Sequence, residues 1–167
     1  MKNKKVLFLT QAAMIAAIYV VLTFVFAAIS FGEVQLRIAE ALTIFPMFTP
    51  AAIPGLFVGC LLGNILGGAA LPDIIFGSLA TLAGAYGTWL LRKKKPFIAC
   101  LPPIVANTLV VPFVLRYAYG INLPIWWMMI TVGVGEVLGC GVLGNVLYFV
   151  LRKYKEPIFR SSQYHAC

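Results

Sequence analysis

Two polar residues inside long apolar runs are the first candidates for chemistry in this sequence. Glu136 lies well inside the last apolar run and is flanked by glycines, and Asn107 lies in the middle of the run before it. Charged groups within apolar helices are costly and are commonly kept for function. A carboxylate accepts hydrogen bonds, whereas an amide both donates and accepts them, which suits the edge of a heterocycle. The alternative for both residues is a hydrogen bond between neighbouring helices.

Further charged residues lie near the starts of predicted helices. Asp73 follows Pro72 at the start of an apolar run, where an acidic side chain often caps a helix. Arg37 is spaced from Glu33 and Glu40 as the partners of helical ion pairs are. These three residues could therefore pair with each other, or they could line the mouth of a pocket.

Four aromatic residues gather near one predicted boundary of the apolar region: Tyr117, Tyr119, Trp126 and Trp127. Aromatic side chains at this depth usually form a belt between lipid and water. One of the two tryptophans could alternatively stack on a planar ligand.

The sequence provides little for catalysis, metal binding or a cofactor. Its four cysteines form no CxxC pair, and its single histidine, His165, lies close to the C-terminus. We interpret the cysteines as small packing residues and expect neither a metal site nor a cofactor. The chain contains no GxxxxGK phosphate loop, no HExxH and no GxSxG motif. We therefore expect that it is not an enzyme.

The composition is that of a membrane protein. Of the 167 residues, 62% are hydrophobic and only 11% are charged, which is too little charge for a water-facing surface. This excludes a soluble enzyme and a disordered chain. The apolar runs do not alternate with polar residues, so we predict helices in a lipid bilayer rather than a barrel. The net charge of +8 lies in clusters at the ends of apolar runs, which does not resemble a nucleic-acid-binding face.

Prolines divide the second apolar run. Residues 41–72 contain no charge, and as one helix they would measure about 48 Å against a hydrocarbon core of about 30 Å. Pro46, Pro50 and Pro54 interrupt the first half, so we predict a break near MFTPAAIP. The predicted spans of this single transmembrane domain are 6–29, 37–48, 50–67, 73–91, 97–116 and 124–151, followed by a cytoplasmic tail at 152–167.

The basic clusters predict the orientation. The N-terminus, the RKKK loop at 92–95 and the C-terminal tail are all basic, which favours the cytoplasmic side for each. An even number of crossings must then separate them. We therefore predict an all-α bundle of six spans, N-in and C-in, with the loops at 30–36, 68–72 and 116–123 outside.

Small residues mark two helix faces. The third predicted span carries Gly55, Gly59, Gly63 and Gly67 at a spacing of four, and the first carries the pairs Ala12/Ala16 and Ala13/Ala17. Such stripes allow two helix backbones to approach closely, within one chain or between subunits. The glycines of the last span favour close packing or room for a ligand.

Five stretches of the chain resemble one family of transporters. They are FGEVQLRIAEAL at 31–42, TPAAIPGLFVGCLLGNILGG at 49–68, DIIFGSLATL at 73–82, LPPIVAN at 101–107 and VGVGEVLGC at 132–140. With the six short spans and the alanine-rich first helix, the chain resembles the substrate-binding (S) subunits of energy-coupling factor (ECF) transporters, and among them the QueT-type queuosine-precursor transporters. The resemblance extends up to Arg152.

The resemblance implies a function in the plasma membrane of a prokaryote. An outward-facing pocket would bind a vitamin-like molecule. A membrane coupling subunit and two cytoplasmic ATPases would then drive the S subunit to topple and to release its substrate inside. The contact with the coupling subunit would be made by the alanines of the first helix, Ala12, Ala13, Ala16 and Ala17.

The implied ligand is preQ1 (7-aminomethyl-7-deazaguanine) or a related 7-deazaguanine. Glu136 would accept hydrogen bonds from the N1–H and 2-amino groups of this ligand. Asn107 would form a hydrogen bond with the ligand's carbonyl group or with a ring nitrogen. Asp73 or Glu40 would pair with the ammonium group, with Arg37 close to the pocket mouth.

Trp126 or Trp127 would stack on the ligand ring. Two alternatives remain open from the sequence: an S subunit for another vitamin or nucleobase-like cargo, and a structural subunit of a membrane complex.

Overall fold

The structure is a computed structural model that describes residues 2–26 and 37–154, with the side chains of the first two left out. All regular elements in these ranges are helices, as predicted, and no strand occurs among them. They are α1 (Lys2–Val25), η1 (Ile38–Met47), α3 (Ala52–Leu66), η2 (Asp73–Gly77), α4 (Ser78–Leu90), α5 (Pro96–Ala99), α6 (Leu101–Tyr117), α7 (Ile125–Glu136), η3 (Val137–Leu143) and α8 (Gly144–Lys153).

Three helices are long and apolar enough to cross a membrane: Lys4–Val25, Pro96–Tyr117 and Ile125–Lys153. η1 and α3 are apolar but shorter. The count of six spans and the N-in, C-in orientation stay predictions. Glu33, the predicted outer loop at 30–36 and the tail from 155 onward lie outside the described residues.

The predicted break in the second apolar run is confirmed. The chain turns at residues 48–51, between the end of η1 and the start of α3. η1 itself is a 3₁₀ helix rather than an α-helix, and Pro46 lies inside it. Proline lacks the N–H and clashes with the carbonyl four residues before it, which disfavours α-helical geometry there.

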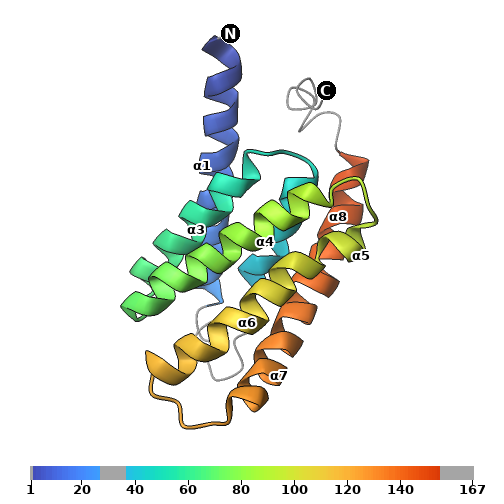
Figure 1. Ribbon diagram of the computed structural model, residues 1–167. Helices are drawn as coiled ribbons and strands as arrows, with labels where there is room; N and C mark the ends of the chain where they lie inside the picture. The colour runs from blue at the N-terminus through green and yellow to red at the C-terminus, as the bar shows by residue number, and fades with distance from the viewer. Residues whose placement is uncertain (1, 27–36, 155–167) are drawn as a thin grey trace.

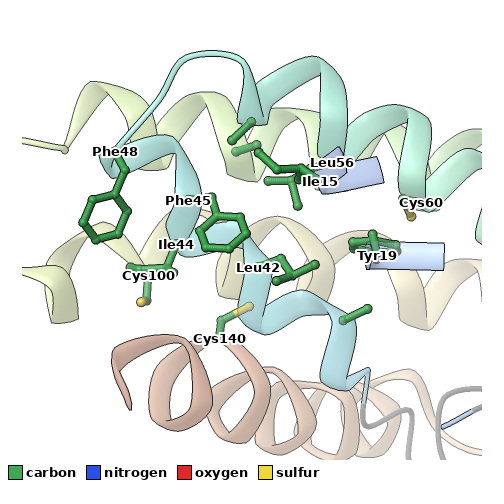
Figure 2. Close-up of a cluster of buried hydrophobic side chains, with 13 residues drawn as sticks. Ile15, Tyr19, Leu42, Ile44, Phe45, Phe48, Leu56, Cys60, Cys100 and Cys140 are labelled. Carbon is green, nitrogen blue, oxygen red and sulfur yellow. The ribbon is translucent and has the colours of Figure 1, made fainter. Parts of the chain in front are cut away.

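η1 is the centre of the hydrophobic core. Its residues from Ala39 to Pro46 are all buried. Figure 2 shows Leu42, Ile44 and Phe45 of η1 surrounded by side chains from several other helices, which include Ile15, Tyr19, Leu56, Cys60, Cys100 and Cys140. A 3₁₀ helix of this length is unusual, so packing on all sides rather than local preference maintains it.

The glycine stripe of α3 packs against α1. A Cβ atom added at Gly55 would lie 2.7 Å from the carbonyl oxygen of Ala12, and one added at Gly59 would lie 2.8 Å from the Cβ of Tyr19. Close packing is therefore confirmed, and the neighbour is a helix of the same chain. Figure 1 shows α1 and α3 in contact at one side of the bundle, with the N-terminal part of α1 projecting beyond the other helices.

Neighbouring helices of the chain pack against one another, and several of them also contact η1. α3 contacts α4, α4 contacts α6, and α6 contacts α7, while η1 also contacts α8 and η3 (Figure 1). Many large apolar side chains remain exposed on their outer faces, among them Leu62, Leu109 and Phe149. Such an apolar exterior fits a hydrocarbon environment.

Candidate functional site

Irregular helices bring buried polar side chains together beside η1. We call the following residues the polar cluster: Tyr19, Arg37, Glu40, Asp73, Thr81, Asn107, Glu136 and Cys140. All eight are buried, although they come from α1, the start of η1, η2, α4, α6, α7 and η3. The π-helical segment η2 begins at Asp73, and η3 begins directly after Glu136. Segments of π-helix inside longer helices occur frequently at functional sites.

Arg37 and Asp73 form a buried ion pair. One guanidinium nitrogen, Nη2, lies 3.3 Å from both carboxylate oxygens of Asp73. The hydroxyl of Tyr119 donates a further hydrogen bond to Asp73 Oδ2 at 3.0 Å. Pro72, not Asp73, occupies the N-cap position of η2, and the hydrogen bonds of the Asp73 side chain go to Arg37 and Tyr119 rather than to a cap. Arg37 forms its ion pair with Asp73 rather than with Glu40.

One oxygen of Glu40 is occupied and the other is not. The hydroxyl groups of Tyr19 and Thr81 both donate to Oε1. Oε2 is buried and has no hydrogen-bond partner among the described residues. A buried polar atom without a partner costs about 1–3 kcal/mol. This oxygen is therefore a point at which a donor from outside the chain could bind.

Glu136 lies opposite Glu40. Each offers an oxygen within 4.8 Å of the other, and the Cys140 sulfur lies within the same distance of both. The Cys140 thiol donates to Glu136 Oε2 at 3.3 Å. Two carboxyl groups thus face each other in the core, and neither forms an ion pair with a basic residue of the described chain.

Asn107 lies next to both carboxyl groups. Its side chain is only 1% exposed and interacts with Glu40 and with Glu136. Even so, neither its Nδ2 nor its Oδ1 makes a hydrogen bond of ordinary geometry to any residue that the structure describes. Most buried polar side chains are hydrogen-bonded, so an amide with both ends unmet requires an explanation. A ligand that both accepts and donates hydrogen bonds would supply partners for both ends of this amide.

The cluster also has the composition of a possible cation site. Glu40, Glu136 and Cys140 could each give one ligand atom to a metal ion, and two carboxylates with a thiolate are a donor set that zinc accepts. This geometry was not anticipated from the sequence, where the cysteines were interpreted only as packing residues. Thr43 and the backbone carbonyl of Glu40 also contact the Cys140 sulfur, at 3.3 and 3.4 Å.

The two predicted tryptophans lie elsewhere. Trp126 and Trp127 are 63% and 46% exposed, and their rings contact each other edge to face. They lie at the start of α7, whereas Glu136 is its last residue. The helical rise places them about 14 Å away along the axis. The structure therefore does not bring them to the polar cluster, and their exposure fits an interfacial belt.

The four alanines of α1 divide into two pairs. Ala16 is buried, and its Cα lies 3.1 Å from a Cβ added at Gly59. Ala12 is half-buried against Gly55, whereas Ala13 and Ala17 are exposed. The first pair packs inside the chain, and only the second is available to a partner.

Sequence reasoning missed several members of the cluster. Tyr19, Thr81 and Cys140 contact the carboxyl groups but were not singled out. Their signal in the sequence is weak, because a single hydroxyl or thiol in an apolar helix is common. Tyr119 was expected in the aromatic belt, yet its hydroxyl binds Asp73 and the backbone of Ala70.

A separate cavity opens between α6 and α7. It has a volume of about 570 Å³, is lined by apolar residues of α6, α7 and η3 with Thr108 among them, and lies open on the outer face, where Leu109 and Val134 are exposed. Thr108 follows Asn107 in the chain, so neighbouring residues of α6 face the cavity and the polar cluster respectively. The residues that line this cavity include no charged group.

Comparison with known proteins identifies the family. The queuosine precursor transporter QueT of Lactococcus lactis subsp. cremoris (strain MG1363) is 36% identical over 84 residues, which are 49% of this chain and 49% of that protein. The match thus spans about half the length of that relative. No solved structure matches the chain. A family model described as QueT transporter matches residues 9–153, which is most of the sequence, so the chain belongs to the QueT transporter family.

Proposed function

We propose that this chain captures a queuosine precursor for uptake across the plasma membrane of a prokaryote. The name of the Lactococcus relative gives the cargo class. Family membership and the apolar helices support transport across a membrane. The ligand we consider first is preQ1, a planar 7-deazaguanine with a donor-rich guanine edge and a carbonyl group at O6.

The observation that carries this proposal is the unmet amide of Asn107 beside two buried carboxyl groups. Glu136 accepts hydrogen bonds from the N1–H and 2-amino groups, since a carboxylate suits paired donors. The Nδ2 of Asn107 donates to O6. The bond from Asn107 would supply a partner that its amide lacks among the described residues, and the bonds to Glu136 would be charge-assisted.

The transport step requires partners. We propose that the chain works as the S subunit of an ECF importer, with six spans, N-in and C-in, and that two partner ATPases hydrolyse ATP through a membrane coupling subunit. The exposed pair Ala13 and Ala17 is the part of the α1 surface that fits this contact. Ala12 and Ala16 are already used by α3.

The test is a calorimetric titration of the chain, purified in detergent, with preQ1 and with guanine, riboflavin and thiamine as controls. We expect tight binding of preQ1 and a loss well beyond tenfold in Glu136→Gln, in which one acceptor becomes a donor. Thr131→Val is the matched control, because the hydroxyl of Thr131 donates to the backbone carbonyl of Met128.

Three results would contradict the proposal in different ways. An unchanged affinity in Glu136→Gln would remove Glu136 from the site. Selective binding of another vitamin or base would keep the transport class and change the cargo. A folded chain that binds none of the four compounds would favour a structural subunit.

A further inference from the structure

We propose that Glu40 is a specificity-determining residue that selects ligands carrying a positive charge. Its free oxygen pairs with the ammonium group of an aminomethyl-deazaguanine, and the site therefore discriminates against neutral ligands with the same guanine edge. This inference rests on the proposed function and adds to it the charge state of the substrate.

The first step concerns the charge of the cluster. The Arg37 guanidinium is held by both oxygens of Asp73, so its charge is already matched. The other basic residues of the described chain lie near helix ends, and the only ion pair in that part is Arg37–Asp73. Glu40 and Glu136 are therefore left without an ion-pair partner among the described residues. Two carboxyl groups this close in the core are complemented by a ligand that brings one.

The second step distinguishes the two carboxyl groups. Glu40 has one oxygen filled by Tyr19 and Thr81, so a single acceptor, Oε2, remains. One free oxygen suits a point charge such as an ammonium group. The thiol of Cys140 donates to Glu136 Oε2. Because a thiol is a weak donor, the N1–H and 2-amino groups of a guanine edge could displace it. Glu136 thus suits the guanine edge, and Glu40 suits the ammonium group.

The third step is the order of the groups. On a 7-deazaguanine the O6 carbonyl stands between the N1–H donor and the substituent at C7. In the structure Asn107 lies next to both Glu136 and Glu40. We place Glu136 at the guanine edge, Asn107 at O6 and Glu40 at the C7 substituent. In this arrangement the ligand forms hydrogen bonds with Asn107 and with Glu40 Oε2, which have none of ordinary geometry among the described residues. A neutral substituent would leave Glu40 Oε2 without a donor.

The test compares preQ1 with 7-cyano-7-deazaguanine, which has the same guanine edge and O6 but a neutral nitrile at C7. Calorimetry on the full chain in detergent measures both affinities for the wild type, for Glu40→Gln and for Glu136→Gln. We expect the wild type to prefer preQ1 by roughly ten- to a hundredfold, the range of a charged hydrogen bond. Glu40→Gln should lose this preference through weaker binding of preQ1 alone. Glu136→Gln should weaken both ligands alike.

The wild-type ratio can overturn the inference even if a variant fails to fold. Equal affinity of the wild type for both compounds would overturn the role of Glu40 and leave the proposed function in place. A Glu40→Gln variant that keeps the preference, or that loses both ligands equally, would also overturn it. Binding of neither compound to the folded wild type would overturn the proposed function together with this inference.

Discussion

The contact between α1 and α3 and the polar cluster are both buried, but they are built in opposite ways. In the contact between α1 and α3, atoms of α1 lie so close to the α3 glycines that a Cβ atom added at Gly55 or Gly59 would clash with them. At the second, three side-chain atoms, Glu40 Oε2 and both amide atoms of Asn107, make no hydrogen bond of ordinary geometry to the described chain. One region is complete within the chain, and the other is not.

This difference separates stability from function. Close packing of small residues stabilises membrane helices through dispersion. Unmet polar atoms and facing carboxyl groups cost free energy in the empty protein. A region that costs stability is retained for another reason, and for the polar cluster we propose that the reason is capture of the ligand. Substitutions in the two regions should therefore have opposite effects on stability and on binding.

The largest effect on stability is expected from Gly59→Leu. The new side chain would meet Tyr19 and Ala16 at distances that α1 cannot accept without moving. Overpacking of this kind costs about 1–3 kcal/mol or more. Thermal unfolding of the chain in detergent should show a clear fall in the midpoint.

Gly141→Ala is the matched control for that substitution. A Cβ at Gly141 would lie 3.6 Å from the Val137 side chain, which is ordinary contact, so the unfolding midpoint should hardly change. Equal effects of the two substitutions would contradict the close contact between α1 and α3.

Asn107→Leu is expected to have a smaller effect on stability, and to raise stability rather than lower it. This substitution removes two unmet polar atoms, so the empty chain should be as stable as the wild type or more stable by about 1 kcal/mol. The same substitution should weaken preQ1 binding by roughly tenfold or more. Thermal unfolding with and without preQ1 measures both changes. A loss of stability together with unchanged binding would assign Asn107 to a purely structural role.

The smallest effect on the isolated chain is expected from Ala17→Leu. This position is exposed, and exposed substitutions usually change stability by no more than about 0.5 kcal/mol. Ligand binding should stay intact, while co-purification with the coupling subunit should fall. Ala16→Leu should instead destabilise the chain itself, because Ala16 packs against α3. Normal co-purification of Ala17→Leu would place the partner contact on another surface.

The features that depend on local spacing were predictable from the sequence. The prolines at 46 and 50 indicated the break between η1 and α3, and the glycine stripe indicated a close contact. Glu136 and Asn107 stood out because polar groups are rare in apolar runs, and both are buried.

The features that depend on distant pairing were not predictable. Arg37 and Asp73 are 36 residues apart, and Tyr19 and Glu40 are 21 apart, so only the folded chain brings each pair together. Helical spacing favoured partners for Arg37 within its own segment, and the tertiary contact with Asp73 prevailed. The 3₁₀ geometry of η1 likewise depends on the packing of its neighbours rather than on its own residues.

The most direct test of the account is the structure of the chain purified with preQ1 bound. We predict that the ring lies in the polar cluster, with its guanine edge on Glu136, its carbonyl on Asn107 and its ammonium group on Glu40. A ring located instead in the apolar cavity between α6 and α7, with the Asn107 amide still unpaired, would contradict the central claim that the polar cluster captures the ligand.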